Sequence, residues 1–194
     1  MEIYQKEMFS RIREGDIFHD IEYVEDTFFR GVGYLGVSFL IFPYVIVLSQ
    51  DCDLESDIRA REKQNQPNKE AVLSTDSVVE SILICPAYDK DLFMAGKHLE
   101  EMNLSVMQSW KPKDTKWGIL TKNKDPRYHF LTGNAELAIN DMVIDFKHFY
   151  TIPRLKLYQE YEKRFVGTIN PLFRELLSQR FANYLSRVGL PEPD

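Results

Sequence analysis

The strongest constraint on the fold is the apolar run of residues 37–48, which leads directly into a polar motif at residues 49–53. The run is rich in aromatic and β-branched side chains, which favour strands. It contains Pro43 and is too short to cross a bilayer as a helix. We therefore predict that residues 34–48 form one or two buried strands, with Pro43 at a bend or a strand start.

A second apolar strand is predicted at residues 81–86, which read Ser-Ile-Leu-Ile-Cys-Pro. Because proline cannot donate a hydrogen bond to a neighbouring strand, we expect this strand to end at Pro86. Strands without polar alternation are buried on both faces. We therefore predict that residues 82–85 pair with residues 45–48 in the centre of the sheet.

Composition narrows the class of protein. A chain of 194 residues fits one domain, and a formal charge of −6 argues against broad binding to phosphates, which requires a net basic face. Two cysteines without a CxxC pair predict neither a disulfide framework nor a zinc finger, and we expect no metal or other cofactor. The N-terminus lacks the apolar core of a secretory signal, so we expect a cytoplasmic protein without a membrane span.

Apolar residues at helical spacing predict three helices. The first covers residues 4–13, and the second, a connecting helix, covers residues 90–104. The third begins with Asn170 as N-cap and Pro171 at its first position, and its apolar stripe continues to residue 188. This last segment is predicted to be an amphipathic C-terminal helix.

The remaining segments complete the predicted layout. Residues 53–68 are highly charged and predict an exposed loop within an insertion at residues 53–80. Turn formers at residues 122–127 predict a hairpin that joins residues 117–120 to residues 128–131. The sequence thus predicts a single α+β domain over residues 1–194.

Four segments, in this order, carry a resemblance. They are Gly15-Asp16-Ile17-Phe18, residues 44–49, residues 82–86, and residues 143–146 leading to residues 151–155. Together they resemble the MazF/PemK-like toxin family. The resemblance implies a small SH3-like β-barrel over residues 15–155, with insertions, and a groove between the first loop and the two apolar strands. It also implies a bacterial or phage toxin–antitoxin or defence context.

Toxins of this family are metal-independent endoribonucleases specific for single-stranded RNA. They use an Arg directly before the Pro of the second motif and a Thr or Ser shortly after the Pro of the third. Here these places hold Phe42 and the pair Ala87 and Tyr88. Cleavage assisted by the 2′-OH group needs a base and a cation, and Phe42 supplies neither.

A ribonuclease on this chain would therefore need relocated catalytic residues. The candidates are Arg30 or Arg127 on the phosphate and Tyr88 or His129 in proton transfer. A cation, a stackable ring and an imidazole at Arg127, Tyr128 and His129 are the mixture that holds an unpaired base or a phosphate. The alternative is an ordinary hairpin in which Tyr128 packs inward while Arg127 and His129 face solvent.

The motif after the first apolar strand is a candidate binding element beside the groove. Neighbouring carboxylates raise a thiol pKa, which disfavours Cys52 as a nucleophile. A metal site lacks paired histidines to support it. We favour a turn in which Cys52 is buried and Asp51 or Asp53 accepts backbone hydrogen bonds. Ser49 and Gln50 are then further hydrogen-bonding residues of the turn.

Three functional hypotheses follow from these observations. We favour a binding or regulatory module that holds a partner protein or single-stranded RNA without cutting it. The alternative is a metal-independent endoribonuclease with relocated residues. A third hypothesis is a regulatory module that makes its contacts through the C-terminal helix, which could also form the interface of a homodimer.

Overall fold

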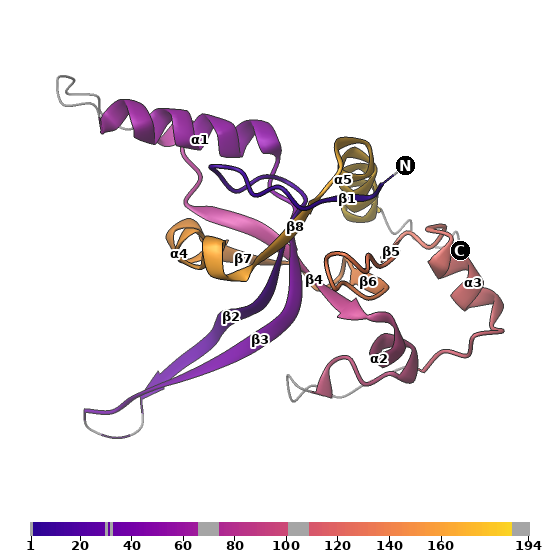
Figure 1. Ribbon diagram of the computed structural model, residues 1–194. Coiled ribbons are helices and arrows are strands. Elements are labelled where there is room, and N and C mark those ends of the chain that lie inside the picture. Colours follow the sequence, from indigo (N-terminus) through magenta and orange to yellow (C-terminus); the bar gives the residue numbers. More distant parts are fainter. Residues whose placement is uncertain (1, 30, 32, 66–73, 101–108, 188–194) are drawn as a thin grey trace, which may run out of the picture.

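One curled antiparallel sheet organises the chain (Figure 1). The computed structural model describes residues 2–29, 31, 33–65, 74–100 and 109–187. Within these residues the strand order is β1-β8-β2-β3-β4-β6-β5, and β7 pairs with β4. The strands are β1 (Tyr4–Gln5), β2 (Asp16–Phe29), β3 (Leu35–Val47), β4 (Ser81–Asp89), β5 (Tyr128–Leu131), β6 (Met142–Asp145), β7 (Tyr150–Pro153) and β8 (Phe165–Ile169). The α+β class is confirmed.

The predicted pairing of the two apolar strands is confirmed, since Val45 lies opposite Pro86 and Val47 opposite Ile84. The predicted end of the second strand is wrong, because β4 continues through Pro86 to Asp89. The first half of β4 pairs with β7 and its second half with β6. This change of neighbour along one strand lets the sheet curl.

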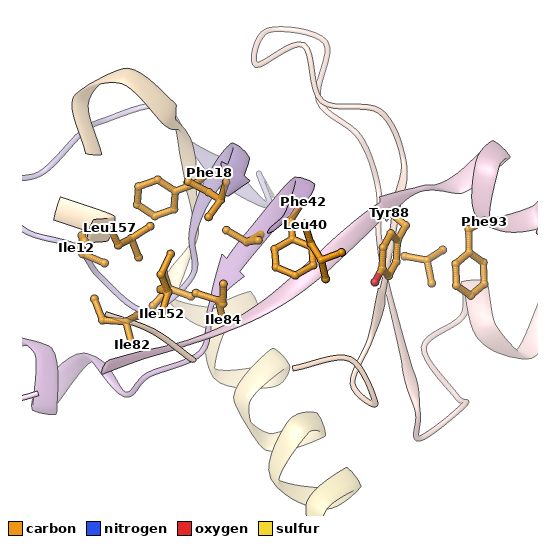
Figure 2. Close-up of a cluster of buried hydrophobic side chains, with 14 of the residues drawn as sticks. Ile12, Phe18, Leu40, Phe42, Ile82, Ile84, Tyr88, Phe93, Ile152 and Leu157 are labelled. Atoms are coloured by element: carbon orange, nitrogen blue, oxygen red, sulfur yellow. The ribbon is translucent and has the colours of Figure 1, made fainter. Parts of the chain in front are cut away.

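Both faces of the sheet are covered, which explains the unbroken apolar runs. Val45 and Val47 of β3 belong to one buried cluster, while Ile46 between them belongs to a second. The first cluster, part of which Figure 2 shows, includes Leu157 of α4 (Arg154–Arg164). The second includes Leu177 of α5 (Pro171–Leu185). The two helices therefore cover opposite faces.

The predicted loop over residues 53–68 is wrong, because α1 (Asp51–Gln64) occupies most of it. The helix has few apolar residues, but the pairs Glu55–Arg59 and Asp57–Arg61 stabilise it at i,i+4 spacing. Asp57 is buried, and it also accepts hydrogen bonds from Arg154 of α4 and from the N–H of Val79. A largely charged segment therefore forms a helix here, and the buried carboxylate of Asp57 joins it to α4 and to the backbone at Val79.

Two further predictions of secondary structure are wrong. Residues 4–13 form no helix, because Tyr4 enters β1 and lies opposite Ile169 of β8. Residues 117–120 are not a strand but lie in α3 (Thr115–Thr121), where Trp117 and Leu120 bury one helical face. The strand β5 pairs with β6 instead of with these residues.

The other two predicted helices are confirmed in part. The connecting helix is shorter than expected: α2 (Lys90–Ala95) ends at Gly96, whose φ of 73° favours glycine, and residues 101–104 lie outside the described part of the chain. The C-terminal helix α5 begins as predicted, with Asn170 as N-cap and Pro171 in its first turn. Residue 188, the predicted end, also lies outside the described residues. No helix in the described part of the chain is long and apolar enough to span a membrane.

Candidate functional site

The polar motif at residues 49–53 stands where β3 passes into α1. Ser49 Oγ accepts a hydrogen bond of 2.8 Å from the N–H of Leu83, which ties this junction to β4. Gln50 is the N-cap of α1, and Asp51 and Asp53 lie in its first turn. Carboxylates there interact favourably with the helix dipole, so the motif is a helix start rather than the predicted turn.

Asp51 collects arginines from two other parts of the chain. Arg11 donates two hydrogen bonds to its carboxylate, at 2.9 and 3.0 Å. Arg13 Nε lies 3.8 Å and Arg174 Nη1 3.9 Å from its oxygens. Partial burial acts to raise the pKa of Asp51, but the hydrogen bonds and charge of Arg11, with the other two arginines, lower it below its ordinary value.

This Asp51 cluster, formed by Arg11, Arg13, Asp51 and Arg174, contains more cations than carboxylates. Glu14 lies next to it, and its carboxylate accepts a hydrogen bond from the N–H of Asp51. Besides its long contact to Asp51, Arg13 lies over the Phe9 ring at 4.1 Å, and Arg174 donates a hydrogen bond to the carbonyl of Glu14 at 3.5 Å. The side chains of Arg13 and Arg174 keep exposed fractions of 21% and 13%, through which they can contact a carboxylate or a phosphate of a partner.

Cys52 is exposed beside this cluster, so the prediction that it is buried is wrong. Its Sγ lies 3.7 Å from both the side-chain oxygen of Gln50 and a carboxylate oxygen of Asp53. The thiol faces outward because it lies on the first turn of α1, away from Leu54, which carries the buried face of the helix. Acceptors surround the thiol, and neither contact supplies a proton-accepting imidazole.

Arg127 and Tyr128 belong to a second polar cluster at the end of β6, which we call the Asp145 cluster and which consists of Arg127, Tyr128, Asp145 and His148. Arg127 forms a two-point ion pair with buried Asp145, at 2.8 and 2.5 Å, and its guanidinium lies 4.9 Å from the centre of the Tyr128 ring. The structure thus satisfies this guanidinium internally. A planar two-point pair of this kind holds Arg127 in place, so its guanidinium is already paired and is less available to a bound phosphate.

Tyr88 reaches the same Asp145 cluster through His148. The hydroxyl of Tyr88 lies 3.3 Å from His148 Nδ1, which is 3.7 Å from a carboxylate oxygen of Asp145. Tyr88 is buried, and burial raises its pKa. Burial also lowers the pKa of His148, and it lowers that of His98, which packs on the Tyr88 ring, to about 4. Burial therefore favours the neutral form of both histidines.

Sequence reasoning missed Asp145 and His148 as partners of Tyr88 and Arg127. Their proximity arises from pairing of β6 with both β4 and β5, in which Tyr88 lies opposite Val143 and Tyr128 opposite Asp145. No local spacing signals such a contact, since about 60 residues separate Tyr88 from His148. The sequence signal for Asp145 was a carboxylate within the apolar run of residues 143–146.

The structure does not bring the proposed catalytic residues together. His129 lies in β5 and packs against Phe146 of the second buried cluster, whereas Tyr88 belongs to the first. His129 is only 3% exposed, and burial with the nearby charge of Arg180 lowers its pKa to about 3. Arg30 lies outside the described residues. The alternative in which His129 faces solvent is therefore wrong.

Comparison of the chain with protein-family models, with curated proteins and with solved structures gives no match. Within the described residues, no group of three or more His, Cys, Asp or Glu side chains is arranged to hold a metal ion. The chemistry of the two clusters must therefore be inferred from their own geometry.

Proposed function

We propose that this protein is a non-cleaving binding module, built on an SH3-like barrel similar to that of MazF/PemK toxins and acting in a toxin–antitoxin or defence context. The observation that carries the proposal is the burial of the groups that relocated cleavage would need. His129 is 3% and Tyr88 1% exposed, so neither reaches a bound RNA in this conformation. Arg127 is paired with Asp145.

The proposed ligand of the module is a partner protein. The Asp51 cluster supports this, because its partly exposed Arg13 and Arg174 are positioned to receive carboxylates. The overall charge of −6 opposes the broad phosphate contacts that retain single-stranded RNA. Protein carboxylates need only a local cationic site, and this cluster supplies one.

The alternative, a metal-independent endoribonuclease, has less support. Cleavage through the 2′-OH group needs an accessible base near neutral pKa. Burial lowers the pKa of His129 to about 3 and that of His98 to about 4, and both values are poorly matched to a base at neutral pH. His148 lies near Arg127 with its side chain 22% exposed, and burial lowers its pKa as well.

An RNA cleavage assay in chelator separates the two functions. Single-stranded RNAs of mixed sequence are incubated with the wild type and with the variants Arg30→Ala, Arg127→Ala, His129→Ala and His148→Ala. We expect intact RNA with every protein. Cleavage by the wild type that is lost in one of these variants, and kept in the exposed control Lys116→Ala, would contradict the proposal.

A further inference from the structure

The hairpin of β2 and β3 extends well beyond the rest of the sheet (Figure 1). β8 pairs with β2 only at residues 16–18, and β4 pairs with β3 only at residues 44–47. Among the described residues, no third strand continues along the hairpin past Ile21 and Phe42. We call residues 22–29 and 33–41 the hairpin arm. It is a two-stranded ribbon, a form that is marginally stable in water on its own.

One face of this arm is apolar and uncovered. Cross-strand partners share a face, and the pairs Val24–Phe39 and Phe29–Leu35 lie on the same one because residues 35, 37, 39 and 41 alternate regularly. A bulge between Val24 and Asp26 adds one residue to β2, so that Thr27 and Phe29 beyond the bulge share this face with Val24. The apolar face consists of Val24 (49% exposed), Phe29 (84%), Leu35 (62%), Val37 (46%), Phe39 (56%) and Ile41 (45%).

The opposite face of the arm is covered by the chain itself. Near the base, the Tyr23 ring packs against Phe42 and Tyr150, with centroids 5.9 and 4.9 Å away. Near the tip, the Phe28 ring lies over Gly36, where a Cβ atom would come within 2.4 Å of it. The sequence thus covers one side of the ribbon with its own rings. The apolar face has no such cover among the described residues.

The exposed apolar face is large enough for a dimer interface. Its exposed area is on the order of 600 Å² per chain, if roughly 150–200 Å² for each of the six residues is multiplied by that residue's exposed fraction. Two such faces together approach the roughly 1,200 Å² at the lower end of specific interfaces. A patch of this size is also at the upper end of what monomeric proteins expose.

Charge favours a second copy over nucleic acid as the occupant. The described residues of the arm carry Glu22, Glu25 and Asp26 and no lysine or arginine, and with Arg30 counted from the sequence, residues 22–41 still have a net charge of −2, which opposes contact with phosphates. Asp26 lies on the opposite face and Glu25 in the bulge, so among the described residues of the arm Glu22 at the base is the one charged residue on the apolar side. When two arms pack antiparallel, each Glu22 approaches the apolar tip of the other arm rather than the other Glu22.

We propose that the apolar face of the arm is a self-association surface, on which a second copy of this chain packs about a two-fold axis. The base of each arm then lies against the tip of the other. Such an isologous contact uses the same patch twice and closes without leaving an apolar surface exposed. This inference is independent of the proposed function, since it concerns a surface that neither polar cluster includes.

Sedimentation velocity of the full chain tests the proposal from low to high micromolar concentration. We expect the wild type to dimerise and Phe39→Lys to weaken the dimer by at least about thirtyfold, because the dimer would bury two ammonium groups. The matched control Ser38→Lys adds the same charge at the next residue, on the other face, and should dimerise like the wild type. Circular dichroism checks folding, and Val37→Lys is a second variant of the apolar face.

Three results would overturn the proposal. A wild type that stays monomeric at high micromolar concentration shows that a second copy does not cover the face. A dimer that persists in both Phe39→Lys and Val37→Lys lies elsewhere, and its loss in Leu176→Lys would place it on exposed α5. Equal dissociation by Phe39→Lys and Ser38→Lys would remove the assignment to this face.

Discussion

The two halves of the β2–β3 hairpin have similar apolar side chains but opposite surroundings. At the base, Phe18, Val45 and Ile46 are fully buried, because β8 and β4 pair alongside the hairpin and the two helices cover the two faces of the sheet. In the arm, Phe39 and Leu35 stay more than half exposed. The difference shows that apolar patterning specifies a strand but does not specify what covers it. Cover comes from distant segments in the base, and we infer that it comes from a second chain in the arm.

The largest effect on the free energy of unfolding is expected at Phe42, in the base of the hairpin. The ring is fully buried and packs against Tyr23 and Tyr150, so Phe42→Ala should lower the free energy of unfolding by about 3–5 kcal/mol. Phe39→Ala, three residues nearer the tip, should cost less than about 1 kcal/mol in the monomer. Urea unfolding at low protein concentration measures both. Equal costs would break the distinction between base and arm.

A smaller effect is expected where β2 begins in the base, at buried Asp16. Burial raises the pKa of its carboxyl to about 7, although the hydrogen bond from the N–H of Arg13 acts to lower this pKa. Since the folded pKa is raised, stability is present below the ordinary pKa near 4 and is lost as the pH rises through 7. Asp16→Asn stays neutral and should therefore gain stability relative to the wild type on going from pH 5 to pH 8.

Thermal unfolding at the two pH values measures this difference, at about 2–4 °C for each kcal/mol. Burial lowers the pKa of His129 to about 3, so protonation of His129 destabilises both proteins toward acid. This contribution is the same in the wild type and in Asp16→Asn, and it cancels in the comparison. The arm residue Asp26, which is exposed, offers a matched control: Asp26→Asn should show no change between pH 5 and pH 8. A pH-independent difference for Asp16→Asn would contradict the account.

The smallest effect is expected at Gly36 in the arm. A Cβ there would lie 2.4 Å from the Phe28 ring, which must swing away from the ribbon. Because that ring is not fully buried, Gly36→Ala should change global stability by less than about 1 kcal/mol. It should speed hydrogen exchange in the arm, whereas Ser38→Ala on the same face should not. A large loss of global stability would mean that the arm is part of the cooperative core.

Local patterns predicted some parts of this fold well. The pairing of residues 45–47 with β4 and the N-terminus of α5 could be predicted, because both-face burial and the Asn170–Pro171 cap are short-range signals. The helix α1 could not, since its buried carboxylate, Asp57, is held by Arg154 nearly a hundred residues away. Trp117 and Leu120 were misassigned because a short apolar run fits either a strand or a helix.

The candidate site was predictable only in its local part. The motif at residues 49–53 could be found as the end of an apolar strand, but not the arginines around Asp51. Arg11 and Arg174 come from opposite ends of the chain and meet only when α5 packs on the sheet. The Asp145 cluster likewise depends on strand pairing. Long-range contacts of this kind leave no spacing in a single sequence.

Hydrogen exchange as a function of protein concentration tests the central claim most directly. If a second copy covers the arm, its amides should become more protected from low to high micromolar concentration, while those of β4 stay unchanged. In Phe39→Lys the arm should exchange rapidly at every concentration. Arm amides that exchange at one rate throughout, or protection that rises over α5 instead, would contradict the account.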